Sequence, residues 1–499
     1  MSTVADTDVL IVGAGPVGLF LANECARRRL RWRLIEKRAT QSEHSKALAI
    51  FPRTLEIFDM AGLAERFLAV ANRVTAVAIE THGHRIATMH FEPQGTPYPF
   101  VAMVPQDVTE RLLCEALSAR GGHVDYCTSF VSAEPQEGGV LVRMDRSGTA
   151  ETVRASFVVG CDGAHSSVRH AADVGFEGGE YADLFLLADV ATNDTLSAAE
   201  MQLCPNEHGP VAIFPMGPTR RRIVGTIAEA IGEAPTLELV QRILAERGPP
   251  GLEARALHWS SYFRVHHRLA ETLRIGCIFL AGDAAHIHSP FGGQGMNTGL
   301  HDVWNLAWKI DLCLRGHANA RLLESYGAER LPVIKGVIGM TDLMTKVMGT
   351  PNRFAQALRN TVIPMVSRLA PFQHAFVERL SELGIAYGGS PIIEGDGRRY
   401  FDETIRGGSG IGSRFILFVG KDAPPRAREA AAALCTGLGD LTELRDGAGE
   451  DITLVRPDGY VACVVRRPDT PSALAPLRTL IESQITPGSA DQQPRHTSG

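Results

Sequence analysis

The chain contains no apolar run long enough to cross a membrane, and its amino terminus lacks an apolar signal segment. Its nine cysteines are scattered without a Cys-x-x-Cys pair. Paired spacing of this kind is typical of zinc sites and disulfide scaffolds, so we expect neither. These absences predict a reduced, cytoplasmic protein that holds no metal.

Neither sign of charge dominates the composition. The 50 Lys and Arg residues nearly balance the 56 Asp and Glu residues, and the basic residues are dispersed. We therefore expect no nucleic acid and no membrane as partner, but a small molecule. At 499 residues, with 44% apolar and 21% charged, the chain should fold into more than one globular domain.

A glycine-rich turn near the amino terminus is the first feature that indicates chemistry. A short apolar strand, residues 8–12, runs into Gly-Ala-Gly-Pro-Val-Gly, and apolar residues at helical spacing follow it. A second strand, residues 30–35, ends in an acid that is placed to bind a ribose. The complete βαβ unit predicts a dinucleotide site. The residues expected there are Gly13, Gly15, Pro16, Val17, Gly18, Glu36 and Lys37.

A second glycine-rich segment follows a strand that ends at Ala281. An acid at this carboxyl edge can accept hydrogen bonds from ribityl hydroxyls. The loop 290–297 then enters a helix near Asn297, and its bare N–H groups would favour the negative charge of a reduced flavin. The segment indicates a redox enzyme, with an ordinary glycine loop as the alternative. The residues expected there are Gly282, Asp283, Pro290, Gly293, Gly295, Met296 and Asn297.

A third acid follows the apolar strand 157–161, in the sequence Asp162-Gly163. Arg169 lies at helical distance behind it. Its guanidinium could meet a pyrophosphate, or it could pair with Asp162 and only fix the loop.

These three segments, in this order, resemble the class A flavoprotein monooxygenases, the FAD-dependent aromatic hydroxylases related to para-hydroxybenzoate hydroxylase, phenol hydroxylase and the aromatic polyketide hydroxylases. The resemblance covers roughly residues 5–395. It implies a tight, non-covalent FAD, with NAD(P)H and oxygen as co-substrates. A C4a-hydroperoxyflavin would then hydroxylate a phenolic or polyketide aromatic compound. Because the chain has one dinucleotide fingerprint, we expect NAD(P)H to bind only transiently.

The resemblance also assigns roles to residues. The three fingerprint glycines hold the pyrophosphate, Glu36 takes the adenosine ribose and Asp283 takes the ribitol. Asp162, Gly163 and Arg169 match a motif associated with the pyrophosphate and NAD(P)H. The remaining cofactor residues implied are Gln106, which opens a helix over 106–120, with Lys46 and Arg53. The family often has Arg in place of Lys46, so a bidentate contact is not expected there.

The loop residues Pro290, Gly293 and Gly295 would flank the flavin ring as the catalytic loop, but no catalytic base can be assigned. His286 and His288 form a His-x-His pair without a visible third ligand, so metal binding is not expected. Several residues of a sheet that we expect to be inserted into the FAD-binding domain could serve as the base, but the sequence does not distinguish them from surface or packing residues. They are His82, His84, His90, Tyr98, Tyr181, His208 and Arg222.

The expected fold class is α/β: a Rossmann-like FAD-binding domain, an inserted antiparallel-sheet substrate domain and a small thioredoxin-like carboxyl-terminal domain. The inserted sheet should contain strands at 74–79, 85–89, 100–104, 184–190, 211–214 and 222–227, and 332–383 should be helical. The expected domains are 1–70, 105–175 and 275–335 for FAD; 71–104, 176–274 and 336–395 for substrate; 396–485 at the carboxyl terminus; and 486–499 as a flexible tail.

The carboxyl-terminal region resembles the small domain of phenol hydroxylase, including its Arg-Pro-Asp-Gly turn at 456–459. Cys435 and Cys463 are isolated, so the domain should be structural or serve oligomerisation, for example in a homodimer. Other readings of the whole chain stay open. One is a related flavin oxygenase that epoxidises, performs Baeyer–Villiger-type oxidation or inactivates an antibiotic. Another is a non-catalytic FAD protein that binds aromatic ligands. A flavin halogenase would require a Trp-x-Trp-x-Ile-Pro segment, which is absent.

Overall fold

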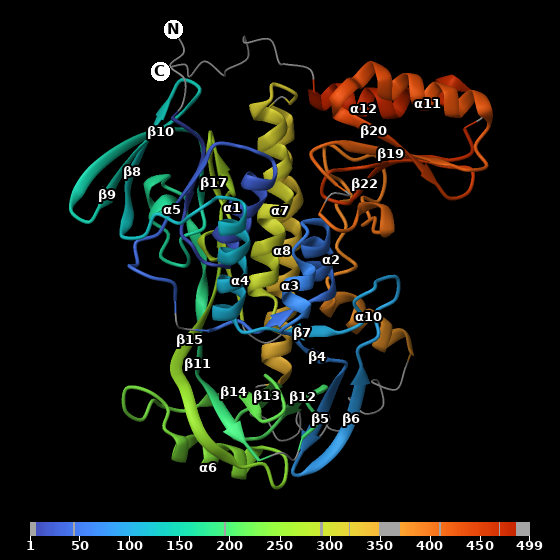
Figure 1. Ribbon diagram of the computed structural model, residues 1–499. Coiled ribbons are helices and arrows are strands. Elements are labelled where there is room, and N and C mark those ends of the chain that lie inside the picture. The colour runs from blue at the N-terminus through green and yellow to red at the C-terminus, as the bar shows by residue number, and fades with distance from the viewer. Residues whose placement is uncertain are drawn as a thin grey trace, which may run out of the picture.

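The computed structural model describes residues 6–42, 45–193, 196–289, 293–318, 320–348, 370–408, 411–468 and 470–485 (Figure 1). Pro290 and the tail predicted for 486–499 lie outside these residues. Among the helices described, none combines the length and the apolar composition that crossing a bilayer requires.

A seven-stranded sheet forms the first layer, and four parallel strands make its centre. These strands are β1 (Thr7–Val12), β2 (Trp32–Ile35), β10 (Thr149–Gly160) and β17 (Ile278–Leu280), and β16 (Arg274–Ile275), β8 (Thr128–Gln136) and β9 (Gly139–Arg146) extend the sheet. Val12 lies opposite both Ile35 and Gly160, and Gly160 lies opposite Leu280. All four parallel strands therefore end at one edge, where the loops that follow them must meet.

Helices cover this sheet, and α1 packs against both α4 and α7. Their apolar faces form the largest core together with the parallel strands. The helix predicted to open at Gln106 is confirmed, and the helix predicted to start near Asn297 begins two residues earlier, at Gly295. The helices are α1 (Pro16–Arg27), α4 (Gln106–Ala119), α5 (Ser167–Ala171), α7 (Gly295–Leu314) and α8 (Ala320–Met348), with the short helix η1 (Gly282–Ala284).

An eight-stranded sheet lies below the first layer in Figure 1. It is antiparallel except where β12 pairs with β5, so the predicted inserted sheet is largely confirmed. The helix α6 (Leu237–Arg247) packs on β15. In order, the strands are β18 (His286–Ile287), β15 (Ala254–Ala270), β11 (Phe176–Thr192), β14 (Arg220–Ile227), β13 (Val211–Pro215), β12 (Glu200–Cys204), β5 (Ala76–Thr81) and β6 (His84–His90).

The strand predicted at 74–79 is confirmed for most of its length, whereas the placement of 100–104 in this sheet is wrong. The segment 74–79 divides at Thr75 into β4 (Asn72–Val74) and β5, because the chain leaves one sheet for another there. The segment predicted at 100–104 is β7 (Val101–Met103), which pairs with β4 and with β3 (Ala49–Ile50) in a separate three-stranded sheet. The helices α2 (Pro52–Met60) and α3 (Ala64–Leu68) follow β3.

The carboxyl-terminal region has its own four-stranded sheet, at the upper right in Figure 1, and its core includes Trp308 and Leu312 of α7 and Leu322 of α8. The Arg-Pro-Asp-Gly turn at 456–459 joins two antiparallel strands of this sheet, β21 (Ile452–Val455) and β22 (Val461–Val465). The strand order is β20 (Thr442–Gly447), β19 (Phe415–Gly420), β21 (Ile452–Val455) and β22 (Val461–Val465). The helices of the region and the segment before it are α10 (Ala370–Leu380), α11 (Pro425–Leu438) and α12 (Ala475–Ile485), with η2 (Glu403–Ile405), η3 (Gly439–Leu441) and η4 (Pro471–Leu474).

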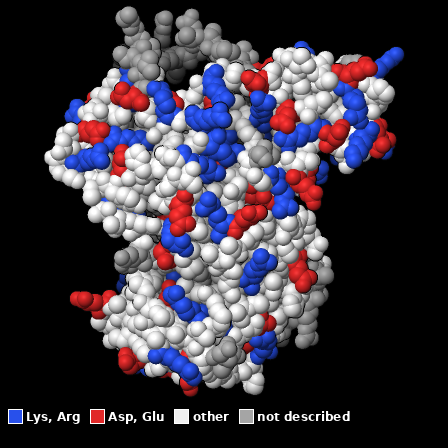
Figure 2. Space-filling model, viewed as in Figure 1, with Lys and Arg blue, Asp and Glu red and all other residues white. Residues whose placement is uncertain are grey.

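Acidic and basic side chains are interspersed over the face shown in Figure 2, with some gathering of basic side chains over its upper middle. The described residues contain no group of three or more His, Cys, Asp or Glu that could hold a metal ion.

Candidate active site

The turn between β1 and α1 forms a cradle of bare backbone. Gly13 has a φ of +100°, and a Cβ there would lie 2.5 Å from the Cys161 oxygen. A Cβ on Gly18 would lie 1.9 Å from the Gly13 oxygen, whereas one on Gly15 would meet no atom within 4 Å. Close packing thus requires glycine at 13 and 18, and open space lies over Gly15. No side chain caps α1, so its first N–H groups fit a pyrophosphate.

A cavity of about 250 Å³ opens in front of this cradle. It brings together residues from two of the three sequence motifs, the first glycine-rich turn with its acid and Asp162-Gly163, and from α4; no described residue of the segment 282–297 lines it. The predicted residues that line it are Gly13, Gly15, Glu36, Lys37, Gln106, Asp162 and Gly163. Sequence reasoning missed several other lining residues, among them Arg38, Ser42, Glu110, Ser129 and Phe130. These residues follow no motif, and only the folded chain places them here.

Glu36 lies at the end of β2 and is ionised. Its Oε2 accepts from the Ala14 N–H at 2.9 Å, and its Oε1 accepts from the main chain and side chain of Arg38 at 3.0 and 2.9 Å. Burial opposes ionisation of Glu36, but these donors lower its pKa below the ordinary value. A carboxylate fixed in this way is suited to accept hydroxyl groups of a ribose.

Asp162 and Arg169 do not form the hydrogen-bonded pair considered above. Asp162 accepts from the Ser166 hydroxyl at 2.5 Å and the Ser167 N–H at 2.7 Å, at the start of α5. Arg169 donates to the Ala164 and Ala284 oxygens at 3.0 and 2.9 Å. Arg169 therefore fastens the turn after β10 to the turn after β17.

Asp283 projects from η1 and is exposed, although dense surrounding protein raises its pKa by desolvation, an effect that His286 and Lys46 partly oppose. An exposed side chain among dense protein atoms is expected at the floor of a crevice. Asp302 holds this turn from behind, accepting from the Gly282 N–H at 3.1 Å and lying 2.7 Å from Nε2 of His286.

Arg330 completes this support, because its Nε donates to Asp302 at 2.8 Å. Burial alone would raise the pKa of Asp302, but His286 and Arg330 lower it to about 2. Asp302 therefore stays ionised behind the turn that carries Asp283. His286 is engaged here, as a support of the turn.

The described part of the glycine loop leads into α7 without a side-chain cap. Gly293 has a φ of +66°, which favours glycine, and Met296 packs at the edge of the core. The Asn297 amide accepts from the Phe51 N–H at 3.1 Å and donates to the Ala49 oxygen at 2.9 Å. Asn297 thus uses its side chain to hold the β3–α2 connection beside the loop.

The segment Ser45–Ala47 is held from two sides. Gln106 Oε1 accepts from the N–H groups of Lys46 and Ala47, at 3.3 and 3.1 Å. From the eight-stranded sheet, Arg222 donates to the oxygens of the same two residues, at 2.9 and 3.1 Å. Gln106 therefore reaches this loop as well as the cavity.

Arg222 is buried and pairs with Asp189, through contacts of 2.7 and 2.9 Å. The sequence did not distinguish Arg222 from the other candidates, and it gave no signal for Asp189. Only the register of β11 and β14, in which Asp189 and Arg222 lie opposite each other, could have identified the pair. The pair joins the eight-stranded sheet to the expected FAD site.

The structure gives Arg53 a different environment from the one expected. Its guanidinium is fully buried, donates to Glu56 at 3.0 Å and to the Asp458 oxygen at 3.3 Å, and lies over the Tyr460 ring. Because the Arg53 guanidinium already interacts with Glu56, Asp458 and Tyr460, Arg53 links α2 to the carboxyl-terminal region.

The other base candidates are not gathered at the site. Tyr98 is buried and donates to Asp59 at 2.6 Å. The Tyr181 side chain lies outside what the structure describes. The remaining histidines are exposed; they are His82, His84, His90 and His208. None of the described candidates is thereby identified as a base.

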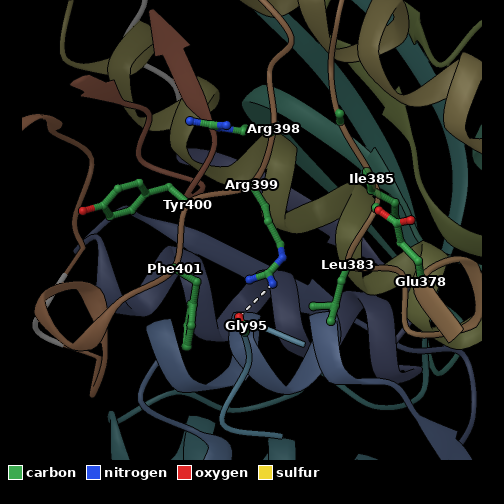
Figure 3. Close-up of a pocket in the computed structure, with 10 residues that line it drawn as sticks. Gly95, Glu378, Leu383, Ile385, Arg398, Arg399, Tyr400 and Phe401 are labelled. Atoms are coloured by element: carbon green, nitrogen blue, oxygen red, sulfur yellow. Dashed lines mark hydrogen bonds between the residues drawn. The ribbon is translucent and has the colours of Figure 1, made fainter. Parts of the chain in front are cut away.

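A larger cavity of about 420 Å³ lies elsewhere, between residues 398–401 and 383–386 (Figure 3). Arg399 on its wall donates to the Gly95 oxygen at 2.8 Å and to Glu56 at 2.9 Å. None of the predicted cofactor residues lines it, so size alone does not identify it as the active site.

Comparisons with known proteins support FAD as the ligand of this cradle. The FAD binding domain family matches residues 6–341. The chain is 35% identical to 6-methylpretetramide 4-monooxygenase of Streptomyces rimosus over 400 residues. This alignment covers 78% of this chain and 71% of the relative. It is 31% identical over 464 residues to rifampicin monooxygenase of Streptomyces venezuelae, with 91% and 94% covered.

A solved structure has the same architecture. The anhydrotetracycline hydroxylase from Streptomyces rimosus superposes with a TM-score of 0.78 at 28% identity, covering 97% of this chain and 100% of that chain. The glycine cradle, the acid at the end of β2 and the acid after β17 are thus found in a chain that matches this family over most of its length. The chain belongs to the FAD-binding family of class A flavoprotein monooxygenases and is an FAD-dependent enzyme of that family.

Proposed function

We propose that the enzyme uses NAD(P)H and oxygen to hydroxylate a bulky phenolic or polyketide aromatic compound. The observation that carries the proposal is the convergence of the Gly15 cradle and Asp283 at one sheet edge, with the Arg222–Asp189 pair joining that edge to a second sheet. A substrate held between the two sheets would lie near the flavin. The domain boundaries and cofactor residues given above, apart from Arg53, are part of this proposal.

Bound FAD would supply the redox chemistry, accepting electrons from a nicotinamide and activating oxygen. The residues of the chain bind and orient it. The first N–H groups of α1 hold the pyrophosphate, Glu36 accepts from the ribose and Asp283 accepts from the ribitol. The start of α7 favours negative charge on the flavin ring. The second sheet, which reaches the site through Arg222, would shield the bound ring from water.

We infer that NAD(P)H binds transiently. Among the described residues of the glycine-rich sequence 407–410, Gly408 packs on Gly62 and its N–H donates to the Asp59 oxygen at 3.1 Å, so this N–H is already engaged and does not favour a second dinucleotide site. Tight binding of NADPH to the oxidised enzyme without substrate would contradict this inference.

The substrate class rests on the relatives. Two of them are named for tetracycline precursors, and a third is named for rifampicin. All of the compounds in these names are bulky and carry phenolic rings. The rifampicin relative also favours the second candidate function, oxidative inactivation of an antibiotic, which would use the same cofactor site.

The experiment is to measure NADPH and NADH consumption by the purified protein with a panel of phenols, polyketide aromatics and rifamycins, while peroxide is assayed in parallel. We expect one class of compound to accelerate consumption without matching peroxide and to gain one oxygen by mass. Stoichiometric peroxide with every compound, or binding without turnover, would contradict the proposal and favour a non-catalytic FAD protein.

A further inference from the structure

A buried ionic cluster joins the carboxyl-terminal sheet to the helices around FAD, and the proposed reaction does not use it. Its centre is Arg456, at the start of the turn Arg456–Gly459. The guanidinium donates to both oxygens of Glu329, at 2.6 and 2.9 Å, and to Asp458 at 3.0 Å. All three side chains are fully buried.

Helix α7 supplies further donors to Glu329. Lys309 Nζ donates to it at 2.8 Å and Asn305 at 2.7 Å. Burial would raise the pKa of Glu329, but Arg456 and Lys309 hold it well below its usual range. Two cations balance two carboxylates, so the position of each group depends on the others. The cluster therefore fixes the turn against α7 and α8.

The main-chain oxygen of Asp458 extends this contact to the segments that carry the FAD cradle. It accepts from Nε1 of Trp304 on α7 at 3.0 Å and from Arg53 on α2 at 3.3 Å. The Trp304 ring stacks on Phe20 of α1, with ring centroids 6.2 Å apart. Helix α1 begins at the pyrophosphate cradle, α2 follows the loop that Arg222 holds, and α7 begins at the glycine loop. One turn thus touches all three supports of the cofactor, directly or through one ring.

The chain just before the carboxyl-terminal sheet strengthens this docking. The Tyr400 N–H donates to the Gly459 oxygen at 2.8 Å. Arg399, beside it, reaches Glu56 on α2 and the Gly95 oxygen, as Figure 3 shows for the second contact. The turn is therefore held at both its first and its last residue.

We propose that the turn Arg456–Gly459 is a positioning element for the flavin, which sets α7 and its glycine loop relative to the Gly15 cradle. The turn touches neither FAD nor substrate and acts through Trp304, Arg53 and Glu329. A change in the turn should weaken FAD binding and alter the flavin absorption spectrum. It should also raise the fraction of NAD(P)H electrons that end as peroxide, and this last readout alone rests on the proposed function.

The test compares Asp458→Asn and Trp304→Phe with two controls. Asp458→Asn removes a charge from the cluster, and Trp304→Phe keeps a ring but removes the N–H that meets the turn. Asp446→Asn breaks an exposed ion pair in the same domain. Leu477→Ala loosens the carboxyl-terminal core from α12 and leaves the hydrogen bonds of the turn in place. FAD affinity is measured by flavin fluorescence, together with the absorption spectrum and the melting temperature of each protein.

We expect Asp458→Asn to raise the Kd for FAD about tenfold and Trp304→Phe to raise it at least about threefold, with shifted flavin spectra. Both controls should stay within about twofold of the unmodified protein. The proposal is overturned if Trp304→Phe leaves affinity and spectrum unchanged, or if Leu477→Ala moves them equally at the same melting temperature. If Asp458→Asn does not fold, the FAD affinity and the flavin spectrum of Trp304→Phe alone test the proposal. Because FAD affinity needs no substrate, a failed search for oxygenation would leave this test intact.

Discussion

Replacing Arg222 with Met should destabilise the protein strongly, because Arg222 is the buried partner of Asp189. The substitution leaves that carboxylate buried and unpaired, and it also removes the donors to the Lys46 and Ala47 oxygens. Breaking a buried ion pair from one side typically costs about 3–5 kcal/mol. The melting temperature of the FAD-free protein should therefore fall by roughly 3–5 °C, because the unfolding entropy of a chain of 499 residues is about 1 kcal/mol per degree.

The assay is thermal unfolding of FAD-free protein, since bound cofactor would add its own stabilisation. Arg220→Met is the matched control, because Arg220 lies two residues earlier on β14 and is exposed. It should change stability by less than about 0.5 kcal/mol. The double variant Arg222→Met with Asp189→Leu should recover much of the loss, since no buried charge is left over. A loss in Arg222→Met no larger than that in Arg220→Met would refute the reasoning.

Three further outcomes are expected. Gly15→Ala should raise the Kd for FAD at least about tenfold while the FAD-free melting temperature stays unchanged, whereas Gly18→Ala should lower both affinity and stability, because only its Cβ clashes with protein. Asp283→Ala should weaken FAD retention, and unchanged flavin occupancy after purification would remove its assigned role. Desolvation raises the pKa of Glu110 to about 7, so the folded state binds its proton more tightly than the unfolded state. Stability should then fall as pH rises from about 4.5 to 7, and Glu110→Gln should remove up to about 3 kcal/mol of that fall in urea titrations.

The parts of the fold that the sequence predicts best are those with local signals. The strand before Gly13, the helix that begins at Gln106 and the hairpin at 456–459 follow from neighbouring residues alone. The convergence of the motif loops also follows, because each loop comes after an apolar strand and parallel strands share an edge.

The strand β15 escapes such reasoning, because its 17 residues carry charged and histidine side chains and lack a clean apolar alternation. It exists because β11 pairs with it along its length. Arg53 shows the same limit at the level of a side chain. Its position in the sequence suggests a phosphate contact, and only the folded carboxyl-terminal turn reveals Tyr460 and Asp458 as its partners.

The register of the parallel strands sets when the cofactor site can exist during synthesis. The acid after β17 is residue 283, and the strand that carries it pairs with β10 in the middle of the sheet. No amino-terminal fragment shorter than 283 residues contains both the cradle and Asp283, and the turn that steadies α7 is made still later, at 456–459. The emerging chain must therefore hold its first βαβ unit together without help from the flavin for more than half of its length.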